Sequence, residues 1–290
     1  MRNMDFKDKL MQRIIELALC EDKITDDITT NSLLEYDNRV SAYTVAKEDG
    51  IVSGIPVFIE IFKKVDPATQ IRVLKNDGDH VKRGDIVLEI AGKESSILKA
   101  ERTALNFLQR LSGIATLTKK YVDKLQPYHI TLLDTRKTTP GMRYLEKKAV
   151  LDGGGSNHRL NLEDMAMVKD NHIRMAGTIS KAVKKIMEKF PQKRIEVEVK
   201  DLTELREALT LQVDVIMLDN FDTGLLKEAV KMKKRSPGVV QFEISGNVTL
   251  ENIAEKAIPG IDFISVGALT HSVKSLDLSL EIRGENERIL

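Results

Sequence analysis

The chain has 290 residues, with 45 Lys plus Arg against 44 Asp plus Glu and a formal net charge of +1. This length suits one large domain or two ordinary ones, with enough material for a core. The near-neutral balance argues against a protein that binds nucleic acid or a membrane surface through an overall basic field, so we expect neither as a partner. The single cysteine, Cys20, excludes an internal disulfide and a cysteine-based zinc site.

The N-terminal segment and the apolar runs bear on where the protein works. The first 23 residues carry charges throughout, which is not the pattern of a secretory signal. No uncharged apolar run approaches the ~18–20 residues that a membrane-spanning helix needs. We therefore expect a cytoplasmic protein.

The first part of the chain mixes helical and strand patterns. Residues 6–20 have apolar side chains at helical spacing, and residues 40–92 form short β-rich runs broken by glycines. Residues 98–125 form a long helical pattern in which Gly113 predicts a break. We predict an N-terminal α+β sandwich domain over residues 1–113. The alternating pattern of residues 274–290 predicts a strand that returns to this domain.

The rest of the chain repeats a strand–helix rhythm. Helical patterns cover residues 178–190, 202–211, 223–234 and 249–257, and short apolar strands are predicted at 130–136, 166–170, 195–199, 213–218, 239–244 and 262–267. Such βα units close into a parallel barrel, although an open doubly wound sheet gives the same local pattern. If "AVLDGG" is a further strand, six or seven strands are present, where a complete barrel has eight. We predict an incomplete parallel α/β barrel over residues 114–273.

Polar residues follow nearly every predicted strand, at the barrel end where active sites are built. A single polar strand end is ordinary, but here the residue types sort by chemistry along the chain. The early strands lead to cations, the middle strands to carboxylates and the late strands to small, glycine-bearing turns. In chain order these residues are Arg136, Lys137, Lys169, Asp170, Glu198, Asp219, Asn220, Ser245, Gly246 and Gly267.

This sorting indicates a polyanionic substrate held together with a metal ion. Arginine binds planar carboxylates through two hydrogen bonds, and lysine supplies a point charge to phosphate. Carboxylates on neighbouring strands can hold Mg²⁺, which keeps several waters and needs few protein ligands. Glycine turns offer backbone N–H groups to phosphate.

At these residues the sequence resembles the quinolinate phosphoribosyltransferases, a family of type II phosphoribosyltransferases. The resemblance covers essentially the whole chain, and its motifs are "ERTALNFLQRLSGIAT", "DTRKTTPGMR", "GGGSNHR", "MVKDNH", "MLDNF" and "SVGALTHS". It implies an N-terminal sandwich, an incomplete barrel, and a homodimer in which one subunit covers the barrel mouth of the other. The implied reaction joins quinolinate to phosphoribosyl pyrophosphate with Mg²⁺, and gives nicotinate mononucleotide, pyrophosphate and CO₂ for NAD biosynthesis. The resemblance leaves open whether dimers associate further.

The resemblance also implies roles for individual residues. Arg136, His158 and Arg159 would hold the two quinolinate carboxylates, and Arg102 would reach the same carboxylates from the partner subunit. The remaining roles belong to the phosphoribosyl end of the site. Four catalytic residues would act there: Lys137 and Lys169 would face the phosphoribosyl pyrophosphate, and Glu198 and Asp219 would bind the ribose hydroxyls and Mg²⁺. The 5′-phosphate would lie on Ser245, Gly246, Asn247, Gly267 and Ala268.

Simpler interpretations were weighed for several segments. "GGGSNHR" alone would indicate only a flexible turn. Arg143, Lys147 and Lys148 are typical of a solvated helix face. No histidine pair has metal-ligand spacing. Residues 70–95 resemble a biotinyl or lipoyl carrier hairpin, but the lysine that such a hairpin presents at its tip is missing. Within enzymes, the alternative is a phosphoribosyltransferase for another base such as nicotinate, which has one carboxylate fewer and needs fewer cations.

Overall fold

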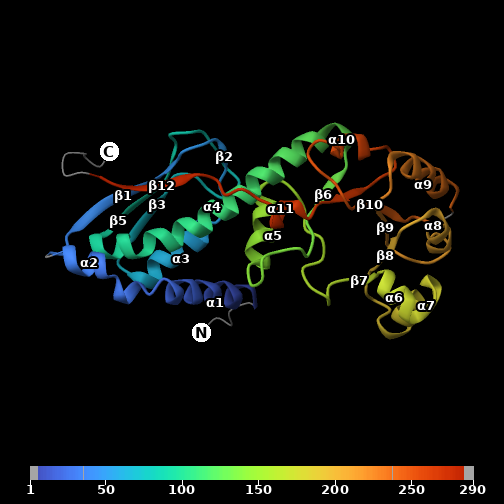
Figure 1. The fold of residues 1–290 in the computed structure, drawn as a ribbon, viewed down its shortest axis with the longest axis horizontal. Helices are drawn as coiled ribbons and strands as arrows, with labels where there is room; N and C mark the ends of the chain where they lie inside the picture. Colours follow the sequence, from blue (N-terminus) through green and yellow to red (C-terminus); the bar gives the residue numbers. More distant parts are fainter. Residues whose placement is uncertain (1–5, 35, 237, 284–290) are drawn as a thin grey trace. The chain divides into compact units, whose positions relative to one another are not determined.

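The computed structural model describes residues 6–34, 36–236 and 238–283 (Figure 1). The chain forms two compact units. The first contains Met1–Lys119, Thr139–Gly154 and Ser272–Leu290, and the second contains Lys120–Thr138 and Gly155–His271. The chain therefore passes between the units more than once, and part of the expected C-terminal strand segment lies outside the described residues. No helix in the described part of the chain has the length and apolar character needed to span a membrane.

The first unit contains an antiparallel sheet whose strands come from both ends of the chain. The strand order is β12-β1-β5-β3, with β12 Leu278–Ile282, β1 Arg39–Ala46, β5 Ile86–Lys93 and β3 Gln70–Val73. Strand β12 lies alongside β1 in Figure 1 and pairs with it antiparallel, so the alternating C-terminal pattern does form a strand. A separate pair of short strands is formed by β2 Gly50–Ile51 and β4 His80–Val81.

Helices cover this sheet and supply most of its core. They are α1 Phe6–Glu21, the 3₁₀ turn η1 Ile24–Asp26, α2 Ile28–Leu33, α3 Ile55–Val65, α4 Glu94–Leu125 and α5 Arg143–Asp152. Helix α3 buries Phe58, Ile61 and Phe62 completely, because its apolar residues recur at helical spacing on one face. The opening helix, predicted over residues 6–20, is confirmed as α1, Phe6–Glu21.

The break predicted at Gly113 is wrong, since α4 runs through this position as one helix of 32 residues. A Cβ at Gly113 would lie 2.3 Å from the carbonyl oxygen of Lys274. The glycine therefore allows another backbone segment to approach the helix closely, and it does not bend the helix.

The strand suggested by "AVLDGG" is also wrong, because these residues end helix α5. A short apolar run does not by itself distinguish a strand from a buried helix. The solvated-face interpretation fails for Lys147, which is only 1% exposed, although Lys148 remains partly exposed on the same helix.

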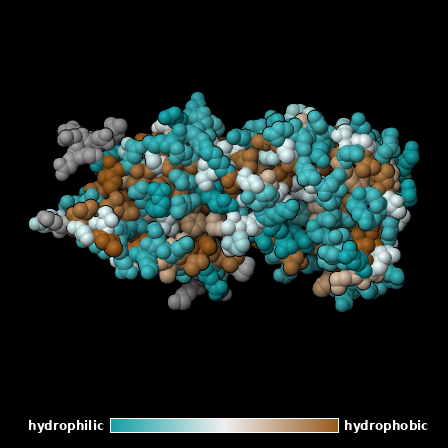
Figure 2. Space-filling model, in the orientation of Figure 1, coloured by the Kyte–Doolittle hydropathy of each residue, from teal (hydrophilic) through white to brown (hydrophobic). Residues whose placement is uncertain are grey.

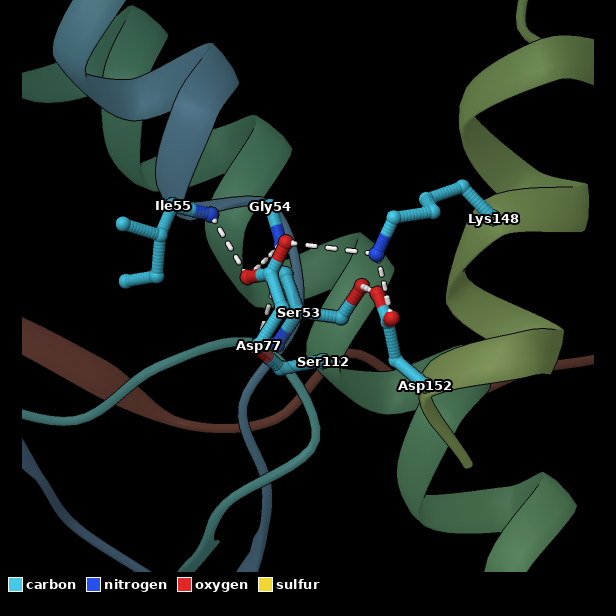
Figure 3. Close-up of polar contacts among 7 residues, drawn as sticks. All are labelled: Ser53, Gly54, Ile55, Asp77, Ser112, Lys148 and Asp152. Carbon is cyan, nitrogen blue, oxygen red and sulfur yellow. Dashed lines mark hydrogen bonds and ion pairs between the residues drawn. The ribbon is translucent and has the colours of Figure 1, made fainter. Parts of the chain in front are cut away.

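A polar cluster joins the start of α3 to the end of α5 within the first unit (Figure 3). Asp77 Oδ1 accepts hydrogen bonds of 2.9 Å from the N–H groups of both Gly54 and Ile55, so it caps α3 from a distant loop. Lys148 lies 3.7 Å from Asp77 and also pairs with Asp152. Burial, with Asp152 adding to it, raises the pKa of Asp77. The seven residues of this cluster are Ser53, Gly54, Ile55, Asp77, Ser112, Lys148 and Asp152.

The second unit is built on a six-stranded parallel sheet of order β6-β11-β10-β9-β8-β7. Its strands are β6 Thr131–Leu133, β7 Ala166–Val168, β8 Ile195–Val199, β9 Val215–Asp219, β10 Gln241–Ser245 and β11 Phe263–Ser265. Each was predicted from the sequence, and the six-stranded form of the incomplete barrel is confirmed.

Helices follow most of these strands, and α7, α8 and α9 lie outside the sheet in Figure 1. The helical elements of this unit are η2 Gln126–Tyr128, α6 Asp170–Ala176, α7 Ile179–Lys189, α8 Leu202–Ala208, α9 Thr223–Arg235, α10 Ile253–Lys256 and α11 Ala268–His271. Side chains of Thr178, Asp201 and Asp222 accept hydrogen bonds from the first turns of α7, α8 and α9. The caps at Asp201 and Asp222 start α8 and α9 soon after β8 and β9, whereas Thr178 starts α7 directly after α6.

Candidate active site

The carboxyl ends of the strands surround a cavity of about 840 Å³ in the second unit. All predicted site residues except Arg102 line it: Arg136, Lys137, His158, Arg159, Lys169, Glu198, Asp219, Ser245, Gly246, Asn247, Gly267 and Ala268. Arg102 lies on α4 in the first unit, where it lines a separate cavity of about 210 Å³ together with Glu21 and Asp22. Within one chain, the structure thus gathers every predicted site residue from Arg136 onward.

Two arginines supply positive charge to the cavity. The Nε atom of Arg136 is buried and makes no hydrogen bond within the described residues. Arg159 donates from Nη1 to the carbonyl oxygen of Met165 over 3.0 Å. Burial, followed by repulsion from the Arg136 charge, lowers the pKa of Arg159. Two neighbouring guanidinium groups, one with an unused buried donor, favour a ligand with more than one negative charge.

His158 is held from several sides by the chain itself. The backbone N–H of His158 donates to the buried carboxylate of Asp134 over 2.9 Å. The ring Nδ1 accepts a hydrogen bond of 2.8 Å from the backbone N–H of Arg159. Its Nε2 lies 2.9 Å from Glu196 Oε2 and 3.5 Å from Glu243 Oε2. The His158 side chain is 7% exposed, and both glutamates are almost completely buried.

The charge state of His158 is set by opposing effects. Burial lowers its pKa, but the contacts with Glu196 and Glu243 outweigh this effect and raise the pKa to about 9. The hydrogen bond from the Arg159 N–H to Nδ1 favours a lower pKa of His158, since only a neutral ring can accept it. Burial in turn raises the pKa of Glu196. The imidazole is therefore the partner of two carboxylates that would be costly to bury alone, although its single charge can balance only one of them.

Sequence analysis missed Glu196 and Glu243. Both stand inside otherwise apolar strands, "IEVEV" and "QFEIS". A carboxylate in the middle of a buried strand needs a partner, and this signal would have identified them. The possible metal-ligand atoms of His158, Glu196 and Glu243 lie within 4.8 Å of one another. The spacing of the histidines along the sequence did not predict this cluster, because its other two members are glutamates from different strands.

The lysines occupy different parts of the cavity wall. Lys169 Nζ lies 2.8 Å from Glu198 Oε2, and the Lys169 N–H donates to His172 Nδ1 over 3.1 Å. The His172 ring therefore serves as a hydrogen-bond acceptor at the start of α6. The Lys137 chain passes over Gly267, where an added Cβ would lie 3.0 Å from Lys137 Cδ.

The two predicted metal-binding carboxylates come from neighbouring parallel strands, with Glu198 on β8 and Asp219 at the end of β9. Glu198 meets Lys169 through Oε2, and Asp219 accepts from Asn220 Nδ2 through Oδ2 over 2.9 Å. Each contact uses one oxygen of its carboxylate. Oxygen donors in a cavity open to water are the ligands that Mg²⁺ prefers, so these residues fit that ion.

The turn that follows β10 has an unusual backbone. Gly246 has φ +87° and Asn247 has φ +50°, both in the left-handed region. Asparagine tolerates this region better than most residues, which explains how Asn247 stands where glycine would be expected. Successive residues in such turns can direct their N–H groups to one point and bind an anion.

The fold and the cavity together define a class of protein: α/β-barrel enzymes that bind multiply anionic substrates at the carboxyl ends of their strands. Comparison with known proteins narrows the class. The family model described as quinolinate phosphoribosyl transferase, C-terminal domain, matches residues 114–281, and the model of the N-terminal domain matches residues 27–112. The chain belongs to the quinolinate phosphoribosyltransferase family.

Individual relatives agree with this assignment. The chloroplastic nicotinate-nucleotide pyrophosphorylase (carboxylating) of Arabidopsis thaliana is 44% identical, over 95% of this chain and 83% of that protein. A probable enzyme of the same name in Bacillus subtilis is 40% identical over 96% of both chains. The solved structure of the nicotinate-nucleotide pyrophosphorylase from Francisella tularensis is 41% identical, with a TM-score of 0.91 over 97% of this chain and 98% of that one.

Proposed function

We propose that this protein transfers the phosphoribosyl group of phosphoribosyl pyrophosphate to quinolinate with loss of CO₂, giving nicotinate mononucleotide and pyrophosphate in NAD biosynthesis. The observation that carries the proposal is the set of basic residues that line one cavity: Arg136, Lys137, His158, Arg159 and Lys169. Quinolinate is a dianion and phosphoribosyl pyrophosphate carries several charges, so the two cannot share a site without such compensation. Nicotinate has a single carboxylate and would leave part of this set without a partner.

The residues act by positioning and by electrostatic stabilisation. Arg136 and Arg159, with His158 beside them, would hold the quinolinate carboxylates, while Lys137 and Lys169 face the phosphoribosyl pyrophosphate and the reacting centre. The C1′–oxygen bond of the ribose breaks with oxocarbenium character, so the reaction needs no nucleophilic side chain. After decarboxylation, the quaternised ring nitrogen accepts the electron density left at C2. The protein therefore lowers the barrier by fixing both reactants in contact and by matching the charge that develops.

Glu198 and Asp219 would hold Mg²⁺ and the ribose hydroxyls, and both residues are suited to this by their oxygen donors and their position on neighbouring strands. When bound, the ion would neutralise charge on the pyrophosphate leaving group. The 5′-phosphate would lie on the backbone of Ser245, Gly246, Asn247, Gly267 and Ala268. The left-handed residues at Gly246 and Asn247 support this assignment, since they make a turn that can present several N–H groups.

We further propose a homodimer in which Arg102 reaches the quinolinate carboxylates of the partner subunit. Arg102 belongs to the first unit and is not among the residues that line the larger cavity, which supports this role. The surface in Figure 2 is mostly hydrophilic, with scattered hydrophobic patches. Leu17 on α1 is 62% exposed, and Ile28 and Leu33 on α2 are 81% and 73% exposed. Such exposure is expected of apolar residues that another subunit covers.

The proposed compartment is the cytoplasm. A single cysteine, Cys20, and no disulfide suit a reducing environment. The Arabidopsis relative is named as chloroplastic and a relative in Nicotiana glauca as mitochondrial, so fractionation with a tagged full-length chain is the appropriate check.

The first test is a turnover assay with quinolinate, phosphoribosyl pyrophosphate and Mg²⁺, in which nicotinate mononucleotide and CO₂ are followed together. A parallel reaction contains nicotinate in place of quinolinate. We expect equimolar nucleotide and CO₂ from quinolinate, and no product from nicotinate. Turnover of nicotinate without CO₂ would overturn the choice of base, and inactivity of folded protein in both reactions would overturn the proposed reaction.

A further inference from the structure

The carboxamide of Asn220 connects two parts of the cavity that come from different strands. Its Nδ2 donates to Asp219 Oδ2 over 2.9 Å, and its Oδ1 accepts from Asn247 Nδ2 over 3.0 Å. Asp219 ends β9, whereas Asn247 belongs to the turn after β10. Asn220, Asp219 and Asn247 all line the cavity. One side chain therefore joins the proposed ribose-binding carboxylate to the proposed phosphate-binding turn.

The backbone holds this side chain in place. Asn220 has φ +57°, and its N–H donates to the carbonyl oxygen of Ser245 over 3.0 Å. On the other side, Asn252 Nδ2 donates to the carbonyl oxygen of Asn247 over 2.8 Å. A non-glycine residue adopts a left-handed conformation at some energetic cost, which its surroundings must offset. At Asn220 the compensating contacts are the two carboxamide hydrogen bonds and the backbone bond to β10.

Gly246 shows how closely the carboxamide packs on the turn. A Cβ at this position would lie 2.2 Å from Asn220 Oδ1 and 2.5 Å from its Cγ, and Gly246 has φ +87°. A larger residue at position 246 would push the Asn220 side chain away and break both of its hydrogen bonds. The glycine of the turn and the asparagine after β9 are therefore sterically coupled.

We propose that Asn220 is a positioning residue that fixes the Asp219 carboxylate relative to the turn Ser245–Asn247. Resting on the proposed function, the inference is that this tie sets the spacing between the groups that hold the ribose hydroxyls and those that hold the 5′-phosphate. The ribose hydroxyls and the 5′-phosphate of one phosphoribosyl group then bind to groups that are already positioned, so little side-chain ordering is needed when the substrate binds. Quinolinate, which would bind at Arg136, His158 and Arg159, should not depend on this tie.

The test uses Asn220→Gly, which keeps the left-handed backbone and removes only the carboxamide. Loss of two hydrogen bonds should raise the KM for phosphoribosyl pyrophosphate about ten-fold, while the KM for quinolinate and the melting temperature stay close to those of wild type. The matched control is His129→Gly, at an exposed residue with φ +55° that does not line the cavity; it should leave both KM values unchanged. An equal rise in both KM values for Asn220→Gly, or no change in either, would overturn the inference.

A double-mutant cycle tests the steric coupling. Gly246→Ala should weaken phosphoribosyl pyrophosphate binding strongly in the wild-type background and clearly less in the Asn220→Gly background, because the clashing carboxamide is then absent. Equal effects in the two backgrounds would contradict the coupling.

Calorimetric binding of ribose 5-phosphate separates this inference from the proposed reaction, because it requires no turnover. Weaker binding to Asn220→Gly than to wild type supports the inference even if quinolinate is not the substrate. Equal binding to the two proteins, or no binding to wild type, overturns it.

Discussion

Arg136 is the single residue on which the proposed site depends most. Its buried Nε has no hydrogen-bond partner in the described part of the chain, and its side chain contributes no apolar volume to the core. We expect Arg136→Ala to lower kcat/KM at least about a hundred-fold, because a positioned charge for the substrate is lost. The free energy of unfolding should change by less than about 1 kcal/mol, since none of the usual causes of large destabilisation applies.

Steady-state kinetics and urea unfolding of the same Arg136→Ala preparation check both expectations. Arg206→Ala, at an exposed arginine on α8, is the control for loss of an arginine as such and should behave as wild type. Arg136→Lys should recover part of the activity at most, because lysine cannot form two parallel hydrogen bonds to a carboxylate. Wild-type kcat/KM for Arg136→Ala would remove this residue from the site.

His158 makes a prediction about pH. Its folded-state pKa is raised to about 9, above its ordinary value, so the stability it contributes should be complete below about pH 6.5 and lost as the pH rises toward 9. The loss should be on the order of 2–3 kcal/mol. The difference in unfolding free energy between wild type and His158→Gln should therefore shrink between pH 6.5 and 9.

An NMR titration of the His158 ring measures the same equilibrium directly. We expect a midpoint well above 7 in wild type and a lower midpoint in Glu243→Gln, which removes one of the two carboxylates near Nε2. A wild-type midpoint below 6.5 would mean that burial and the Arg159 N–H, which favour the neutral ring, prevail over the two glutamates.

At the scale of elements, the N-terminus of helix α3 is capped by a residue more than twenty positions away in sequence. Asp77 accepts from both Gly54 and Ile55 (Figure 3). We expect Asp77→Ala to lower the unfolding free energy by about 1–2 kcal/mol, as for other lost N-caps. Asp77→Asn should cost less, because its carboxamide oxygen still accepts from the same N–H groups. Urea unfolding at neutral pH checks this order.

The pH dependence of the Asp77 variants separates the cap from the charge. Burial raises the pKa of Asp77, so its ionised form is disfavoured in the folded protein. Wild type should therefore gain stability relative to Asp77→Asn as the pH falls through that raised pKa, and lose this advantage as the pH rises. A difference that is constant with pH would show that Asp77 is not desolvated as the structure indicates.

The elements that sequence could predict are those whose pattern is local. Strands β8, β9 and β10 are apolar runs between turn signals, and the helices that follow β8 and β9 carry N-caps at Asp201 and Asp222. Helix α5 was partly misread because its burial depends on a distant partner: Glu146 is completely buried against Arg110, with a separation of 2.6 Å. A helical charged residue that is buried by tertiary pairing gives no local signal, whereas Glu196 inside the apolar strand β8 gives one, although its partner His158 is not visible in the local pattern.

For the candidate site, the cations and carboxylates at strand ends were predictable because parallel strands bring their carboxyl ends to one edge. Asn220 was not, since its role depends on the register of β9 with β10, where Asp219 pairs with Ser245. Register is not visible in the spacing of residues along one strand. The position of Arg102 relative to any barrel is a question of quaternary structure, which the sequence addresses only through its family resemblance.

At the scale of the whole molecule, the proposed sharing of a site between two subunits predicts complementation between inactive chains. Arg102→Ala and Lys137→Ala should each inactivate the homodimer. In a mixed dimer, however, the barrel that keeps Lys137 receives Arg102 from the other chain, and one of the two sites is complete. Random reassembly of equal amounts should yield half mixed dimers, and thus about a quarter of wild-type activity per chain.

Two differently tagged chains, mixed under reversible dissociation and purified through both tags, give the decisive measurement. Purified mixed dimers should then reach about half of wild-type activity. The control is a mixture of Lys137→Ala with Lys169→Ala: both lesions lie in the barrel, so no mixed dimer has a complete site and no activity should return. If Arg102 acted on the barrel of its own chain, each site of an Arg102→Ala/Lys137→Ala dimer would lack one residue. Inactive mixed dimers would therefore place Arg102 in its own subunit's site.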